Sequence, residues 1–154
     1  MQSVGQNLRA FYYLDGGSVL DSGISRLPIL SACTSMTSVT LTTSALSLHA
    51  DPDRLRQTLV FLASLPAAIC RMRLELKYYE SWTGKSTLAP TMQEVNWAAI
   101  SRALEAYANL AALEIGVQCF YCAPNCTSLA DDVSVQAAVL ERFPARLRAV
   151  AIFI

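Results

Sequence analysis

The chain lacks most of the features that would assign a function directly. Its 12 basic and 12 acidic residues cancel, so it has no excess positive charge to attract a phosphate backbone, and we expect no nucleic-acid binding. The longest apolar run, near residues 61–70, is about half of the ~20 residues that a membrane span requires, and Pro66 interrupts it. The opening residues contain no apolar segment typical of a signal peptide. We therefore expect neither membrane insertion nor secretion.

Cysteine usage also indicates where the chain is expected to be located. The five cysteines are an odd number without a secretory signal, which is typical of a reducing environment, so we expect an intracellular chain, cytoplasmic or nuclear. Cys119, Cys122 and Cys126 have a spacing that metal ligands use, but no fourth ligand is near them in the sequence. Packing and loop thiols are the favoured interpretation, and we expect no metal and no cofactor.

Two other short motifs suggest catalysis only weakly. The single histidine, His49, lies two residues before Asp51, but no nucleophile joins them, and Asp51 is better placed to cap a helix. The segment 83–87 contains Gly-Lys-Ser, yet Tyr79 stands where a phosphate loop needs its first glycine. We expect a solvated loop there, and the sequence predicts that the protein is not an enzyme.

The chain does contain a six-residue phrase, apolar-x-x-apolar-x-apolar, that recurs along its length. Four copies are clear, and a fifth has a polar first position: Leu8-Phe11-Tyr13, Met36-Val39-Leu41, Leu110-Leu113-Ile115, Leu147-Val150-Ile152, and the degraded Arg71-Leu74-Leu76. The repeat starts therefore lie near residues 8, 36, 71, 110 and 147. A phrase that recurs every ~20–50 residues is typical of stacked-repeat proteins. We expect one repeat domain over residues 1–154, belonging to a longer repeat array.

Each phrase predicts a strand, and helix signals lie between the phrases. The expected strands cover 9–14, 38–43, 71–79, 111–118 and 148–154. A helical turn should open at Pro28, and Asp51 should cap a longer helix. A third helix begins with either a Thr91–Glu94 capping box or Asn96 as the cap, and either Asp131 or Asp132 caps the last one. The apolar stripes of these helices consist of Ile29, Leu30 and Cys33; Leu55, Leu59, Leu62 and Leu65; Trp97, Ile100, Leu104 and Tyr107; and Val135, Val139 and Phe143.

Alternation of strands and helices predicts a parallel sheet. The last two apolar positions of each phrase should face the helices, and the intervening positions should form an open face. That face would comprise Ala10, Tyr12, Ser38, Thr40, Thr42, Arg73, Glu75, Lys77, Ala112, Glu114, Ala149, Ala151 and Phe153. Its central charged positions, and our candidates for binding a partner, are Arg73, Glu75, Lys77 and Glu114.

The phrase resembles the leucine-rich repeat. In residues 30–41, Cys33 precedes the first leucine position by three residues, as in the cysteine-containing repeats found behind F-box domains. Residues 96–115, together with 142–147, resemble the degenerate repeats of large fungal F-box-like families. The resemblance implies an α/β, leucine-rich-repeat-like solenoid fragment with about five parallel strands on one face and helices on the other.

The chain also departs from the leucine-rich-repeat pattern. The asparagine expected three residues after the last leucine position is replaced by Gly16, Ser44, Tyr79 and Gln118. The copies are longer than the usual ~20–29 residues. No F-box-like segment precedes the repeats in the sequence, so the docking of an adaptor cannot be transferred to these residues.

Two classes of function fit these observations. The first is a non-catalytic protein-interaction scaffold, in its most specific form the substrate-recognition repeat region of an F-box-like protein. The second is a small parallel α/β enzyme with its site at the loops after the strands, for which Gly16-Gly17 is the only glycine-rich hint. Helices on one face of the sheet favour the scaffold, and helices on both faces favour the enzyme. If the open face does not bind, the long loops Glu80–Pro90 and Phe120–Ala130 are the next candidates.

Overall fold

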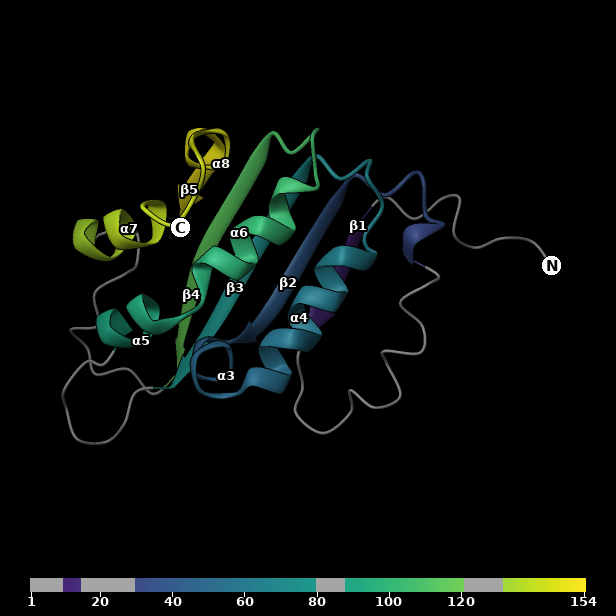
Figure 1. Ribbon diagram of the computed structural model, residues 1–154. Coiled ribbons are helices and arrows are strands. Elements are labelled where there is room, and N and C mark those ends of the chain that lie inside the picture. Colours follow the sequence, from purple (N-terminus) through teal and green to yellow (C-terminus); the bar gives the residue numbers. More distant parts are fainter. Residues whose placement is uncertain (1–9, 15–29, 80–87, 121–131) are drawn as a thin grey trace.

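The chain folds as a mixed α/β protein with a parallel sheet (Figure 1). The computed structural model describes residues 10–14, 30–79, 88–120 and 132–154. The strands are β1 (Ala10–Leu14), β2 (Ser38–Ser44), β3 (Arg71–Tyr79), β4 (Ala112–Phe120) and β5 (Ala151–Phe153). The helices are α3 (Ala45–Ala50), α4 (Pro52–Ser64), α5 (Leu88–Glu94), α6 (Trp97–Glu105), α7 (Val133–Leu140) and α8 (Ala145–Val150). The predictions for Leu8, Gly16, Gly17, Pro28 and Ile29 lie outside the described residues.

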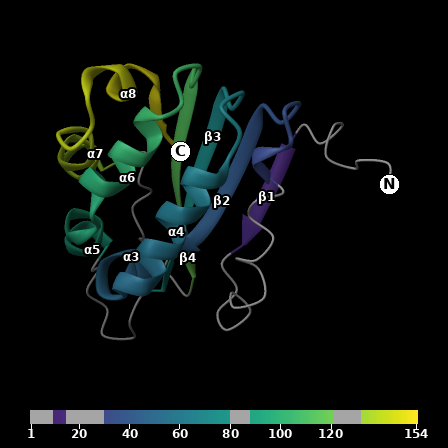
Figure 2. The same ribbon diagram turned by 45° about the vertical axis from the view of Figure 1, so that its right-hand side comes forward.

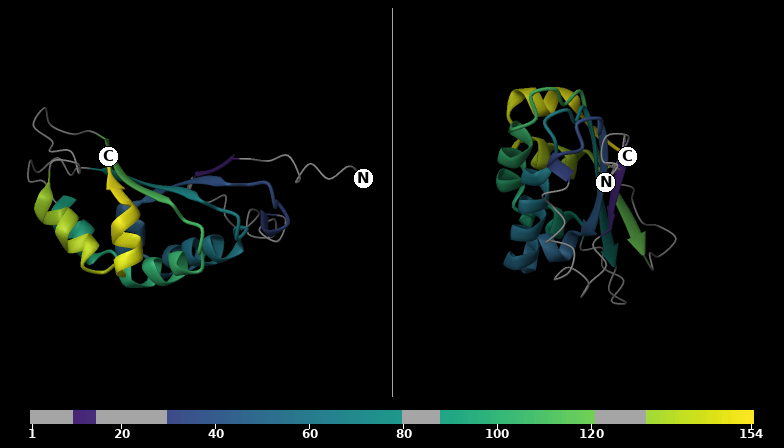
Figure 3. Two further views of the ribbon diagram at one scale, coloured as in Figure 1. Left: turned by 90° about the horizontal axis from the view of Figure 1, so that it is seen from above. Right: turned by 90° about the vertical axis from the view of Figure 1, so that its right-hand side faces the viewer.

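The strands follow one another across the sheet in the order of the sequence, β1-β2-β3-β4-β5, and every neighbouring pair is parallel. Viewed along the sheet, the described helices lie on one side, and no described helix covers the other side (Figure 3). Figure 2 shows the same helices in front of the sheet. A parallel pair requires a crossover connection. The described crossovers between β2 and β4 carry helices over the same face, so one buried layer separates sheet and helices.

The register of the sheet corrects the position of the third repeat copy. Val39 of β2 lies opposite Met72 of β3, which lies opposite Leu113 of β4. The third copy is therefore Ile69-Met72-Leu74, all buried, and the prediction that it starts at Arg71 with a polar first position is wrong by two residues. Leu74 and Leu76 are also buried on the helix side. Because buried residues recur at every second position of β3, the sequence alone cannot show which two of them belong to the repeat phrase.

Equivalent turns set this register before the three central strands. Met36 N donates to Cys33 O at 2.9 Å, Ile69 N to Pro66 O at 3.2 Å, and Leu110 N to Tyr107 O at 3.1 Å. The next residues then bond from copy to copy: Cys70 N donates to Thr37 O at 2.9 Å, and Ala111 N to Cys70 O at 2.8 Å. The same local geometry thus recurs at the steps from β2 to β3 and from β3 to β4.

The last strand differs from its prediction. Residues 148–150 belong to helix α8 rather than to a strand, and β5 contains only three residues. Ala151 lies opposite Leu113, and Ile152 lies opposite Glu114 and is 54% exposed. Because Ala151 rather than Val150 pairs with Leu113, the register differs from the predicted one by one residue and the faces are exchanged. Four strands of five to nine residues therefore make up the sheet, with a three-residue strand at the β4 edge.

The same shift corrects the predicted open face at this end. Ala151 and Phe153 pack against the core, whereas Ile152 takes the outward position. Ala149, also expected on the open face, lies in α8. The predicted inward residue Val150 is in that helix too, where it is partly buried against the core.

The buried layer contains most of the residues that the helix stripes predicted, although Leu55 and Leu59 are only partly buried. Trp97, Leu104, Leu113 and Ile115 are all at most 2% exposed, which confirms that they are buried. The Trp97 ring meets the Phe143 ring edge-on with centroids 6.0 Å apart, and its Nε1 donates to the Met92 carbonyl at 2.7 Å. A buried indole N–H normally needs such a partner.

Polar side chains define the starts of the helices. The Asp51 carboxylate accepts from Asp53 N at 3.0 Å and Arg54 N at 3.1 Å, and the Asp132 carboxylate accepts from Val135 N at 3.1 Å. Both caps agree with the sequence patterns.

The third predicted helix is two helices in the structure. Asn96 caps α6, its Oδ1 accepting from Ala99 N at 3.1 Å. The alternative Thr91–Glu94 capping box is wrong, because both residues lie inside α5. The sequence pattern did not anticipate α5 or the short helix α3.

Candidate functional site

The open face of the sheet carries polar side chains arranged in rows across β2, β3 and β4. In the parallel register the rows are Ser38–Arg71–Ala112, Thr40–Arg73–Glu114, Thr42–Glu75–Gly116 and Ser44–Lys77–Gln118. Residues two apart on a strand share one face. The four predicted candidates therefore lie in three adjacent rows of one surface.

Arg73 forms ion pairs with two of the other candidates, Glu75 and Glu114. Its guanidinium lies 3.0 Å from the Glu75 carboxylate and 3.6 Å from the Glu114 carboxylate. Thr42 Oγ1 donates to the second Glu75 oxygen at 3.3 Å. The Glu75 side chain is only 14% exposed, whereas Arg73 and Glu114 are 42% and 41% exposed. Glu75 is thus an anchor for Arg73, and Arg73 and Glu114 are accessible to a partner.

Lys77 lies at the far end of this group. It follows Glu75 by two residues on β3 and is partly buried. The expected charged surface is consequently present, but its members are unequal in exposure.

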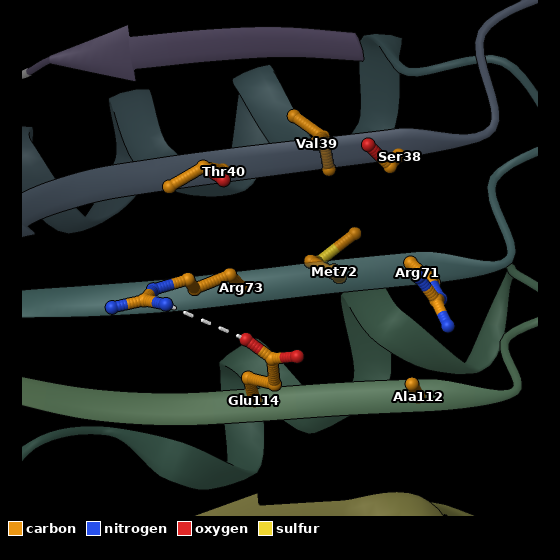
Figure 4. A pocket seen from close by; sticks show the side chains of 8 residues that line it. All are labelled: Ser38, Val39, Thr40, Arg71, Met72, Arg73, Ala112 and Glu114. Atoms are coloured by element: carbon orange, nitrogen blue, oxygen red, sulfur yellow. Dashed lines mark ion pairs between the residues drawn. The ribbon is translucent and has the colours of Figure 1, made fainter. Parts of the chain in front are cut away.

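A hollow of about 220 Å³ lies beside the Arg73–Glu114 pair, above the first residues of β2, β3 and β4 (Figure 4). Its lining comprises Ser38, Val39, Thr40, Arg71, Met72, Arg73, Ala112 and Glu114. The side chains of Val39 and Met72 are buried on the helix side, so the polar lining comes from the open face.

The sequence analysis did not place Arg71 on this surface, because it took Arg71 as the first position of a degraded repeat copy. The alternation Arg71-Arg73-Glu75-Lys77 contained the signal. In a strand, this spacing puts all four side chains on one face.

The other motifs raised by the sequence do not add to this surface. Residues 83–87, Cys122, Cys126 and Asp131 lie outside the described residues, as do the side chains of His49 and Cys119. Cys33 is buried and Cys70 is partly exposed. Within the described ranges, no three His, Cys, Asp or Glu residues are grouped so that they could hold a metal ion.

Among the residues that the structure describes, Tyr107 and Asp132 have shifted pKa values, and both belong to the helix layer. Burial raises the pKa of Tyr107 to about 12, and the Tyr107 hydroxyl donates to the Leu62 carbonyl. Hydrogen bonds from the Ser134 hydroxyl and from Val135 N lower the pKa of Asp132. These shifts accompany a packing contact and a helix cap.

Comparisons with known proteins leave the family open. No protein-family description, curated protein or solved structure matches the chain. None of the helices in the described ranges is long and apolar enough to cross a lipid bilayer. The class defined by the structure is a mixed α/β protein with a parallel sheet, and the leucine-rich-repeat and F-box-like resemblance stays a prediction.

Proposed function

We propose that this chain is a non-catalytic protein-interaction scaffold that binds a partner through the open face of its sheet. The observation that carries the proposal is the one-sided arrangement of the layers, since the described helices cover only one face (Figure 3). The other face presents Arg73, Glu75, Lys77 and Glu114 from neighbouring strands.

The charged groups on this face are held in place before any partner arrives. The Glu75 carboxylate, fixed by Thr42, orients the Arg73 guanidinium toward Glu114. Side chains that are already ordered lose less conformational entropy on binding. A fixed pattern of opposite charges also discriminates between partners more than it adds raw affinity.

The recurring turns before β2, β3 and β4 support the more specific form of the proposal, a leucine-rich-repeat-like solenoid. In such stacks each repeat contacts its neighbours, and the curved sheet is a common binding surface. Together with the sequence resemblance, this is the basis for proposing the substrate-recognition repeat region of an F-box-like protein.

The enzyme alternative receives less support. A doubly wound α/β enzyme carries helices on both faces of its sheet and binds ligands at the carboxyl ends of its strands. The described helices lie on one face (Figure 3), and the hollow lies at the opposite, amino-terminal end of the strands.

The test is affinity capture from a cell extract followed by mass spectrometry. The open-face variant is Lys77→Glu with Glu114→Lys, and the matched control is Arg56→Glu with Glu105→Lys on the exposed surfaces of α4 and α6. Both double variants leave the net charge unchanged. Arg73 is left intact because Arg73→Glu would place a third carboxylate beside Glu75 and Glu114.

We expect the open-face variant to recover at least ~10-fold less of a specific partner, which corresponds to about 1.4 kcal/mol, while the control retains it. Thermal unfolding of each variant verifies that the fold is intact. If both variants retain every partner at full recovery, binding does not use this face.

A further inference from the structure

The hollow on the open face is open because Arg71 has small neighbours. Ser38 flanks Arg71 on β2 and Ala112 flanks it on β4. In the next row, Arg73 lies between Thr40 and Glu114, so one wall of the hollow carries the ion pair. The volume of about 220 Å³ is below the ~300–1,000 Å³ of typical small-molecule pockets. Its size therefore suits a single side chain.

The two arginines that line the hollow differ in their partners. Arg73 is shared between Glu75 and Glu114. Arg71 is exposed, and its side chain makes no ion pair or hydrogen bond with another residue of the described ranges. Figure 4 shows its guanidinium above the hollow, on the side of β4. Among the described residues, Arg71 thus lines the hollow without a carboxylate partner, and Ser38 lies beside it on β2.

We propose that this hollow binds one carboxylate side chain, an aspartate or glutamate, from an acidic segment of a protein partner. The inference rests on the proposed scaffold function and specifies the chemistry of its partner. A guanidinium pairs with a carboxylate through two parallel hydrogen bonds.

Glu114 distinguishes a carboxylate from a phosphate in this hollow. Its carboxylate lies on the wall beside Arg73 and repels any incoming anion. Arg73, Glu75 and Glu114 together already carry one negative charge beside Arg71, so this surface opposes the charge of about −1.5 to −2 on a phosphate at neutral pH more strongly than a single added negative charge. The singly charged carboxylate is therefore the ligand that the charges fit.

The test is an NMR titration with blocked peptides. The ligand is an acetylated and amidated hexapeptide of alternating alanine and glutamate, and the control peptide replaces each glutamate with glutamine. The arginine Nε–H resonances of the protein report binding, and Arg71→Gln identifies the Arg71 signal. Inorganic phosphate and a single-stranded DNA oligonucleotide are titrated separately.

We expect the glutamate peptide to shift the Arg71 resonance at millimolar concentration and the glutamine peptide to leave it unchanged. Arg71→Gln should weaken binding at least ~10-fold, a loss within the range for a charge-assisted hydrogen bond, and Arg71→Lys should restore part of it. The matched control Arg56→Gln, which removes an exposed arginine from α4, should bind like the native chain.

The inference is overturned if the glutamate peptide does not bind at millimolar concentration, if Arg71→Gln binds it equally well, or if phosphate or DNA binds more tightly. Capture of a partner that still depends on Lys77 and Glu114 would then leave the scaffold proposal standing. Conversely, the peptide could bind at Arg71 while the Lys77→Glu, Glu114→Lys variant recovers every partner as well as the native chain does. That result would refute the scaffold proposal alone.

Discussion

The contact between Tyr107 and helix α4 allows a prediction about pH. The Tyr107 ring is 3% exposed, and its hydroxyl donates to the Leu62 carbonyl in the last turns of α4. Leu65 N donates to the same carbonyl at 3.3 Å, so Tyr107→Phe does not leave that acceptor unpaired. We therefore expect a loss near the net value of a hydrogen bond, about 0.5–1.5 kcal/mol, rather than the larger penalty for a buried group without a partner.

The pH dependence follows from the direction of the pKa shift. Burial raises the pKa of Tyr107 from 10.0 to about 12, because the buried phenol must stay neutral. The contribution of neutral Tyr107 to the free energy of unfolding is complete below pH ~10. It declines above that pH because Tyr107 ionises in the unfolded chain before it ionises in the folded chain, and it is lost above pH ~12. Over this window the native chain should lose up to roughly 2–3 kcal/mol, at about 1.4 kcal/mol per pH unit.

Urea unfolding of the native chain and of Tyr107→Phe, from pH 8 to pH 11.5, measures this loss. The difference between the two proteins cancels the titration of the remaining tyrosines. The native chain should be the more stable at pH 8, and its advantage should shrink and then reverse above pH 10. A difference that stays constant across the whole range would refute the reasoning.

Four further predictions concern the core, a helix cap, the sheet edge and the thiols. Leu113→Ala should lower the free energy of unfolding by about 2–5 kcal/mol, and a change within ~0.5 kcal/mol would place Leu113 at the surface instead. Asn96→Ala should cost about 1 kcal/mol by thermal or urea unfolding, because Asn96 caps α6; no loss would show that another group caps the helix. In Gly116→Val the new side chain should displace Ile154, whose Cγ1 lies 3.1 Å from the position of a Cβ at residue 116. Hydrogen exchange at Ile154 N, which donates to Ile115 O, should then accelerate at least ~10-fold, the opening free energy falling by about 1.4 kcal/mol, and unchanged exchange would contradict the contact. Finally, the purified chain should titrate with five free thiols and contain no stoichiometric zinc or iron by mass spectrometry, and a bound metal would overturn the interpretation of Cys119, Cys122 and Cys126.

The central part of the fold was predictable because its signals are local and agree with one another. Residues 71–78 alternate polar and apolar side chains over eight positions, and the structure places β3 at Arg71–Tyr79. Trp97, Ile100 and Leu104 recur at helical spacing, and all three are buried. Side-chain periodicity determines which face is covered, and here no competing period was present.

The misses occurred where a long-range contact decides between locally equivalent patterns. Ile69 is the true start of the third copy because Cys70 N bonds to Thr37 O, a pairing across 33 residues. The first residues of the strand expected at 148–154 belong to helix α8 instead. In that helix Leu147 is fully buried, and Arg146 donates to the Tyr107 carbonyl at 2.9 Å. Neither contact leaves a local signature in the sequence.

The candidate surface was predictable in composition but not in geometry. Alternation placed Arg73, Glu75 and Lys77 on one face. It could not show that Glu75 is largely covered, or that the small neighbours Ser38 and Ala112 leave a hollow at Arg71. Those properties depend on the register between strands, which only the assembled sheet defines.

The order of the strands also bears on how the protein is made. Each described strand pairs only with the strands before and after it in the chain, so no later strand has to be inserted between two earlier ones. As synthesis proceeds from the amino terminus at about 5–20 residues per second, each new strand and helix can dock onto a sheet edge that already exists. The growing edge, rather than the complete sequence, is then the template on which the next segment folds.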